Sequence, residues 1–172
     1  MASDPDLVIA LEGPEVLDEL RPLWLELHHH HQTVAPELAP FADDATSWIA
    51  RRESYERWLV LPESFVVVAR SDGVPVGYAM VRVEETDNEW FDTWVVGRML
   101  AELETFVLAP QKRGQGVGNA MLDRVESELE ARGVSDVVIA HIAGNDAARR
   151  LYERRGYRPA MVMMTRFGAR TD

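Results

Sequence analysis

The chain has 172 residues, carries a formal net charge of −11 and contains no cysteine. This length suits one domain over residues 1–172, and the lack of cysteine excludes disulfides and an acyl-cysteine intermediate. No apolar run of about 18 residues could span a membrane, and no N-terminal signal peptide is present, so we expect a cytoplasmic protein. The 17 arginines against one lysine indicate a GC-rich coding genome, and we expect a bacterial source.

The hydrophobic pattern predicts an alternation of strands and helices. A short strand is expected over 7–11, helices over 14–31 and 46–60, and a hairpin over 64–70 and 74–84. Residues 85–99 are acidic and rich in tryptophan, and the pattern assigns them no element. A strand over 103–109, a helix over 115–132, a strand over 136–142, a helix over 145–155 and a last strand or hairpin over 157–167 complete the order.

Charge divides the chain into two parts. Residues 1–104 contain 21 acidic and 7 basic residues, whereas residues 105–172 contain 8 acidic and 11 basic residues. A basic part suits an anionic nucleotide ligand, and an acidic part suits a cationic acceptor and argues against nucleic acid. Surface acids that only keep the protein soluble explain the same counts, so both interpretations stay open.

Three alternating glycines follow the strand over 103–109 and begin the next helix. Gly114, Gly116 and Gly118 leave the backbone bare where a helix N-terminus exposes unpaired N–H groups. Such a terminus carries about half a positive charge and binds anions, phosphates above all. An ordinary glycine-rich turn is the structural alternative. The pattern favours a site for pyrophosphate.

Two well-known phosphate-binding motifs do not fit this turn. A P-loop requires Gly-Lys followed by Ser or Thr, and that sequence does not occur in the chain. A dinucleotide fingerprint requires G-x-G-x-x-G, but Asn119 occupies the position of its third glycine. That fingerprint also belongs to a first βα unit, whereas this turn lies two-thirds along the chain. Spacing and context therefore exclude both.

A third pattern fits both this turn and a segment downstream. Residues 111–116, Gln-Lys-Arg-Gly-Gln-Gly, match the acyl-CoA-binding pattern Q/R-x-x-G-x-G/A. The pattern N-x-x-A-x-x-x-Y-x-x-x-G-F/Y follows at Asn145, Ala148, Tyr152, Gly156 and Tyr157. With these two motifs the chain resembles the GCN5-related N-acetyltransferases, the GNAT superfamily. The resemblance implies an α/β (α+β) fold, with a mixed, mostly antiparallel twisted sheet flanked by helices on both faces.

The resemblance also implies acetyl-CoA as cosubstrate and no metal. Main-chain groups of the strand before the turn would pair with the pantetheine arm, and one of these N–H groups would polarise the thioester carbonyl. The backbone of the turn would bind the pyrophosphate, and the capping asparagine would reach the pantetheine or a water. The implied cofactor-binding residues are Phe106, Val107, Leu108, Gln111, Lys112, Arg113, Gly114, Gln115, Gly116, Val117, Gly118, Asn145 and Ala148.

Two residues match the catalytic groups of the family. Tyr152 corresponds to the general acid that protonates the departing thiolate, although a tyrosine that only packs a helix explains the residue too. Glu104 corresponds to a general base that acts directly or through water. Glu102 shares its strand face, and two neighbouring carboxylates raise one another's pKa. The structural alternative is a pair of solvated acids at a strand end.

The residues that bind the acceptor are less defined. His28 and His31 are the two members of a four-histidine run that share a helix face, and no third ligand suggests a metal site. They face the acceptor cleft or merely pack. Trp94, with Trp90 and Phe91, likewise lines the acceptor pocket or packs.

The function expected from the resemblance is direct acetyl transfer from acetyl-CoA to a primary amine of a small molecule or peptide. Its competitor is a non-catalytic acyl-CoA-binding regulatory module on the same fold. Neither interpretation includes nucleic acid or a membrane as partner, and a homodimer is compatible with both. The motifs specify the cofactor and leave the acceptor undetermined.

Overall fold

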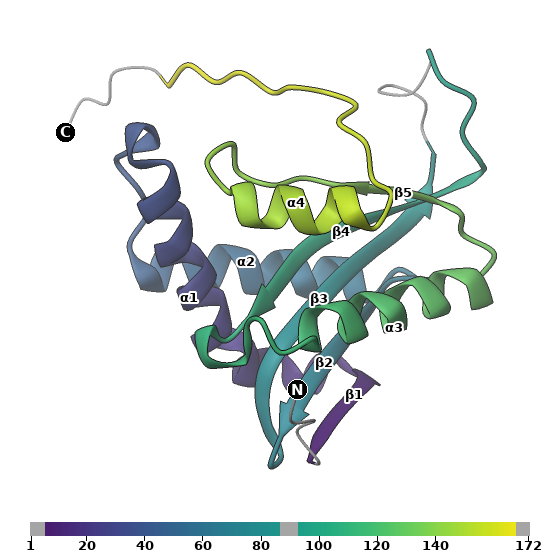
Figure 1. Ribbon diagram of the computed structural model, residues 1–172, viewed down its shortest axis with the longest axis horizontal. Coiled ribbons are helices and arrows are strands. Elements are labelled where there is room, and N and C mark those ends of the chain that lie inside the picture. The colour runs from purple at the N-terminus through teal and green to yellow at the C-terminus, as the bar shows by residue number, and fades with distance from the viewer. Residues whose placement is uncertain (1–5, 87–92, 168–172) are drawn as a thin grey trace.

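The structure, a computed structural model, describes residues 6–86 and 93–167 (Figure 1). It contains one mixed sheet with strand order β1-β2-β3-β4-β5. Neighbouring strands are antiparallel from β1 to β4, and β5 runs parallel to β4. The strands are β1 (Leu7–Glu12), β2 (Phe65–Ser71), β3 (Val74–Glu85), β4 (Met99–Leu108) and β5 (Asp136–Ile139).

Helices cover both faces of this sheet, as predicted. The long helices are α1 (Leu17–Val34), α2 (Asp44–Leu59), α3 (Val117–Ala131) and α4 (Asp146–Arg154). Helices α1 and α2 contact each other and β3, whereas α3 contacts β1, β2 and β3 from the opposite face. Short 3-10 turns precede α1, α2 and α3. The mixed, mostly antiparallel sheet flanked by helices is therefore confirmed.

The core lies where the middle strands are covered on both faces. Residues 66–69 of β2, Val-Val-Val-Ala, are completely buried, which accounts for their continuous apolar pattern. On the face opposite to α1 and α2, Met121, Leu122 and Val125 of α3 pack into the same core. Among the described residues, no helix is both long and apolar enough to cross a membrane.

The end of the chain differs from the sequence prediction. Residues 157–167 were expected to form a last strand or hairpin, and the structure shows neither. This segment leaves the region of α4 as an extended chain that Figure 1 shows away from the sheet. Its apolar side chains, Met161, Val162, Met163 and Met164, are exposed. Pro159 lacks the N–H that a strand ladder requires, and four consecutive apolar residues do not have the period of a half-buried strand.

Candidate active site

Strand β4 has one edge that is only partly paired. On one side β3 pairs with it from Met99 to Leu108. On the other side β5 pairs with residues 100–103 only. Residues 104–108 therefore face no strand on that side within the described chain. Backbone N–H and C=O groups at such an edge can bind an extended ligand that carries amide groups.

A bulge lies where this open edge begins. Met80 of β3 pairs with Thr105, but the next residue, Val81, pairs with Leu103, so Glu104 is the extra residue. Glu104 lines a groove with residues of α1 and α2, and Thr105 bonds to Tyr55 of α2. Two consecutive side chains thus face the same helices, which a regular strand does not allow. The bulge therefore places Thr105 on the same helix-covered face as Glu104.

The glycine turn joins the open edge to α3. Gly114 and Gly116 have φ angles of 72° and 88°, a left-handed conformation that favours glycine. Gly116 is also the N-cap of α3, and no side chain caps this helix. The first N–H groups of α3 consequently lack helical partners, which suits a phosphate. The cations of the turn fold back on the protein: Lys112 Nζ donates to Ser71 Oγ at 3.0 Å, and Arg113 Nε to the Leu108 carbonyl at 3.1 Å.

Helix α4 places Tyr152 beside the open edge. Asn145 begins this helix, and its side-chain oxygen accepts a hydrogen bond from the Ala148 N–H at 3.1 Å. The Tyr152 ring is buried and packs edge-on against Phe106 of β4, with ring centroids 6.5 Å apart. A Cβ added to Gly118 would lie 3.7 Å from the same Phe106 ring. The structure therefore brings together the turn, the edge of β4 and Tyr152.

The hydroxyl of Tyr152 is suited to donate a proton. Burial, with a smaller contribution from Tyr157, raises the pKa of Tyr152 above its usual range, so the phenol is neutral at physiological pH. Among residues 6–86 and 93–167, no side chain forms a hydrogen bond with this hydroxyl. The phenol proton thus remains available to a ligand.

A groove with a volume of about 450 Å³ lies beside Glu104, on the face of β4 that α1 and α2 cover. Helices α1 and α2 form its walls and β4 contributes the carboxylate. The lining residues are Trp24, Ser47, Ala50, Arg51, Ser54, Trp58 and Glu104.

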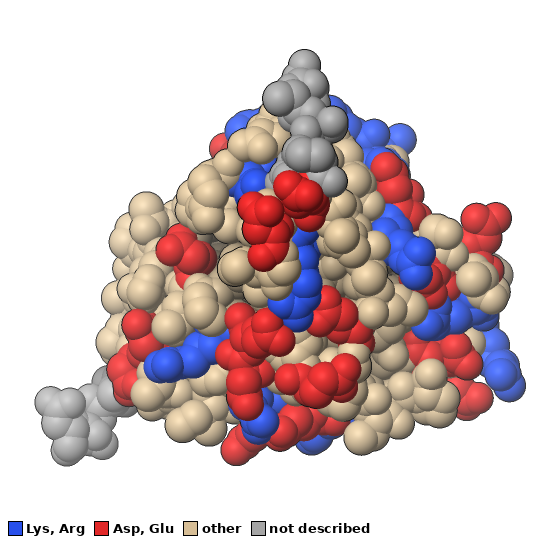
Figure 2. Space-filling model, turned by 90° about the horizontal axis from the view of Figure 1, so that it is seen from below, with Lys and Arg blue, Asp and Glu red and all other residues tan. Residues whose placement is uncertain are grey.

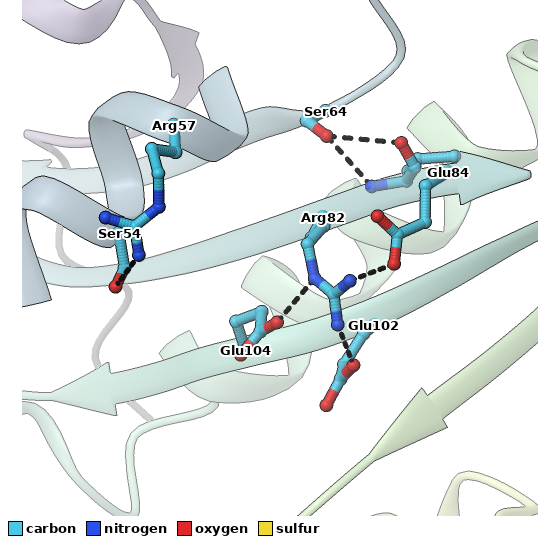
Figure 3. A network of polar contacts seen from close by, with 8 residues as sticks. Ser54, Arg57, Ser64, Arg82, Glu84, Glu102 and Glu104 are labelled. Atoms are coloured by element: carbon cyan, nitrogen blue, oxygen red, sulfur yellow. Dashed lines mark hydrogen bonds and ion pairs between the residues drawn. The ribbon is translucent and has the colours of Figure 1, made fainter. Parts of the chain in front are cut away.

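Arg82 holds three carboxylates, one of which, Glu104, lines this groove (Figure 3). Its Nε donates to Glu104 at 2.7 Å, and its two terminal nitrogens bind Glu84 and Glu102. Glu102 and Glu104 thus share Arg82 and one strand face. Burial raises the pKa of Glu104, the hydrogen bond from Arg82 lowers it, Glu102 raises it, and the charge of Arg51 lowers it slightly. The net increase makes Glu104 a stronger base than an ordinary carboxylate.

The predicted acceptor histidines lie outside the groove lining. His28 is buried, and its Nε2 lies 2.9 Å from the Ala42 carbonyl oxygen and from Gln32 Nε2. Burial, followed by the charges of neighbouring histidines and Arg51, lowers the pKa of His31 to about 4. No group of three His, Cys, Asp or Glu residues in the described chain could hold a metal ion.

The aromatic residues predicted to line the acceptor pocket or pack are not part of the described lining of this groove. Trp94 is 47% exposed and lies in an irregular segment that does not line the groove, while Trp90 and Phe91 lie outside the described residues. Arg51 was not predicted as a groove residue. Trp24 and Trp58 line the same groove, and the tryptophans of the two predicted helices were the signal that could have indicated a ligand-binding wall.

An open strand edge, a glycine turn and an uncapped helix N-terminus together define a site for an elongated, amide-containing anion. The family described as "Acetyltransferase (GNAT) family" matches residues 19–157. The chain therefore belongs to the GNAT acetyltransferase family.

Individual relatives support the same fold. Mycothiol acetyltransferase of Beutenbergia cavernae is 35% identical over 102 residues, which cover 48% of this chain and 34% of that protein. The chain thus spans about a third of the length of this curated relative. A GCN5-related N-acetyltransferase from Ralstonia eutropha JMP134 has a TM-score of 0.72 at 18% identity, covering 94% of this chain and 98% of the other. Aminoglycoside N-acetyltransferase AAC(6')-Iy in complex with CoA has a TM-score of 0.67 at 17% identity, covering 95% of each chain.

Proposed function

We propose that this chain is an acetyl-CoA-dependent N-acetyltransferase that transfers the acetyl group directly to a primary amine of a small molecule. The observation that carries the proposal is the position of the open β4 edge over residues 104–108. The glycine turn and Tyr152 lie on one side of this edge, and the groove with Glu104 lies on the other. The edge separates a cofactor side from an acceptor side.

The cofactor side fits acetyl-CoA by the chemistry of its groups. The unpaired backbone of Phe106, Val107 and Leu108 would bind the pantetheine amides as an added strand. The N–H groups of residues 113–118 would bind the pyrophosphate at the start of α3. Acetyl-CoA supplies the activated acetyl thioester, and an N–H of the β4 edge would stabilise negative charge on its carbonyl oxygen.

Two side chains would move the protons of the transfer. Glu104 would accept a proton from the acceptor ammonium or amine, directly or through water, because its raised pKa favours proton uptake. Tyr152 would donate its phenol proton to the CoA sulfur as the thiolate leaves, because this hydroxyl is protonated and has no side-chain partner in the described chain. With a neutral amine, Glu104 takes up one proton and Tyr152 gives up one, and both side chains return to their starting states by exchange with solvent. An ammonium acceptor loses one further proton to solvent.

A binding-only regulatory module is the competing function. It requires the cofactor side and has no use for a carboxylate of raised pKa directed into a groove on the other side. The names of two relatives, mycothiol acetyltransferase and aminoglycoside N-acetyltransferase, also support a small amine as acceptor. These observations favour the enzyme.

The test combines cofactor binding with turnover. Acetyl-CoA should raise the melting temperature of the protein, and thiol release over a panel of amines should identify acceptors. Tyr152→Phe should bind acetyl-CoA like the wild type and lower turnover by about 10²-fold or more. Tyr157→Phe is the matched control, since it removes a phenol from the neighbouring ring. Full turnover by Tyr152→Phe would disprove the acid assignment, and no thermal shift with acetyl-CoA would disprove the proposed function.

A further inference from the structure

The groove contains a cation that the proposed proton transfers do not use. Arg51 of α2 lies over Trp24 of α1, with its Cζ 4.4 Å from the ring centroid. The same atom lies 5.7 Å from the Tyr55 ring and 5.8 Å from the Trp58 ring. Three aromatic rings from two helices therefore hold one guanidinium at the wall of the groove.

Arg51 has no carboxylate partner within the described chain, and it is the arginine that lines the groove. Across residues 6–86 and 93–167 it forms no ion pair, whereas the adjacent Arg52 binds Asp18 and Glu56, and Arg82 binds three glutamates. Basic side chains on the face shown in Figure 2 likewise lie among acidic ones. In a chain with a net charge of −11, an unpaired guanidinium inside a groove is a site for an external anion.

A hydroxyl beside Arg51 can complete this site. Ser47 lines the same groove, and its Oγ accepts a hydrogen bond from Trp24 Nε1 at 3.1 Å. The hydroxyl proton of Ser47 is not used in this bond and can be donated to a ligand oxygen. A planar guanidinium with an adjacent hydroxyl donor matches the two oxygens of a carboxylate.

The β4 side of the groove has the opposite charge. Glu104 lines the groove, and Glu84, Glu102 and Glu104 surround the single guanidinium of Arg82, which leaves an excess of negative charge. This side suits an ammonium group and repels a dianion such as phosphate. A groove that holds one cation and a surplus of carboxylates suits a small zwitterion.

We propose that Arg51 and Ser47 form a carboxylate-binding subsite, and that the acceptor is a small amine that also carries a carboxylate, such as an amino acid. The carboxylate binds Arg51, and the amine is directed toward Glu104. This inference rests on the proposed acetyl transfer and specifies its acceptor class. It replaces the cationic acceptor expected from the charge of residues 1–104 with a zwitterionic acceptor.

The experiment compares matched acceptors. Thiol release from acetyl-CoA is measured with a panel of amino acids, their carboxamides and the corresponding decarboxylated amines. The wild type should use amino acids with a kcat/KM about tenfold to a hundredfold above the carboxamides, as expected for hydrogen bonds to a charged group. Arg51→Gln should reduce this ratio toward one, mainly by raising KM for the amino acids.

Two further variants separate recognition from folding. Arg52→Gln removes the same charge from the next residue of α2 outside the groove and should keep the wild-type preference. Arg51→Lys keeps the charge without the planar fork and should give an intermediate ratio. An acetyl-CoA thermal shift like that of the wild type shows that each variant is folded. If Arg51→Gln shows no such shift, the ratio measured with Arg51→Lys decides the test.

Four results would overturn the subsite. Equal use of amino acids and carboxamides by the wild type, an unchanged ratio in both Arg51 variants, or turnover with amines but none with amino acids each contradicts it. Preference for a phosphate-bearing amine such as phosphoethanolamine contradicts it as well. All of these leave the proposed acetyl transfer intact, whereas absence of acetyl-CoA binding in the wild type contradicts that function itself.

Discussion

Tyr55→Phe tests how the groove is fixed to the sheet. Tyr55 Oη of α2 lies 2.9 Å from Tyr78 Oη of β3 and 2.6 Å from Thr105 Oγ1 of β4. Tyr55 and Tyr78 are 0% exposed and Thr105 is 2% exposed. Burial raises the pKa of Tyr55 to about 12 and that of Tyr78 well above its usual value, so both phenols stay neutral at physiological pH. This network ties the helix that carries Arg51 to the residue after Glu104.

The expected loss follows from two broken hydrogen bonds. A hydroxyl left without a partner in the core costs about 1–3 kcal/mol, the lost bond included, and for neutral groups we take about 1–2 kcal/mol each. Tyr78 and Thr105 form no hydrogen bond with each other within the described residues, so we expect Tyr55→Phe to cost about 2–4 kcal/mol. At about 2–4 °C per kcal/mol for a chain of this size, the melting temperature should fall by about 5–15 °C.

A triple variant supplies the control. Denaturant unfolding is compared for the wild type, for the single variants Tyr55→Phe, Tyr78→Phe and Thr105→Val, and for their combination. The triple variant removes every partner and strands no polar group, so it should be less destabilised than the sum of its single variants. A loss below about 0.5 kcal/mol for Tyr55→Phe, or strict additivity of the three changes, would refute this reasoning.

Two other changes test the cofactor turn and the base. Gly116→Ala places a side chain at φ 88°, which costs about 1–2 kcal/mol, and adds a methyl group at the expected pyrophosphate site. It should weaken acetyl-CoA binding in calorimetry. The control Gly133→Ala, at φ 68° beyond the other end of α3, should lower stability without changing affinity. Equal affinities of the two variants for acetyl-CoA would exclude the turn as the pyrophosphate site. Glu104 must be deprotonated to act, and burial raises its pKa, so the rate should rise with pH above the usual carboxyl range near 4.3. Glu104→Gln should lower turnover about 10²-fold or more and remove this rise, and a pH profile unchanged in the variant would identify another base.

The features that could be predicted from the sequence are local in the chain. The left-handed turns at Gly114 and Gly116 and the cap at Asn145 depend on neighbours within a few residues, so motif spacing specifies them. The mixed sheet was predictable too, because apolar runs and turn residues determine strands and hairpins. The absence of a strand over residues 157–167 could not be predicted in this way. These residues are apolar enough for a strand, but a strand also needs a pairing partner, and the local sequence does not specify one.

The acceptor groove depends on contacts between distant segments. Arg51, Arg52 and Arg57 lie on one helix and look alike in the sequence, yet only Arg51 packs on Trp24, because α2 lies along α1 with Ser47 and Arg51 beside that ring. The histidine run shows the converse case, a conspicuous residue that packs against the protein. His28 is conspicuous in the sequence, but its ring nitrogen binds the Ala42 carbonyl and stabilises the loop before α2. Tertiary packing determines which polar residue faces a ligand.

The bulge at Glu104 links the two halves of the candidate site. In a regular strand, the side chain after Glu104 would point to the face of α3 and α4. With the extra residue, Glu104 and Thr105 both face α1 and α2, and Phe106 returns to the face of Tyr152. The unpaired edge begins at the same residue, because β5 pairs no further than Leu103. In the proposed transfer, a thioester bound along that edge would have Glu104 on one face and Tyr152 on the other, which a regular, fully paired β4 would not provide.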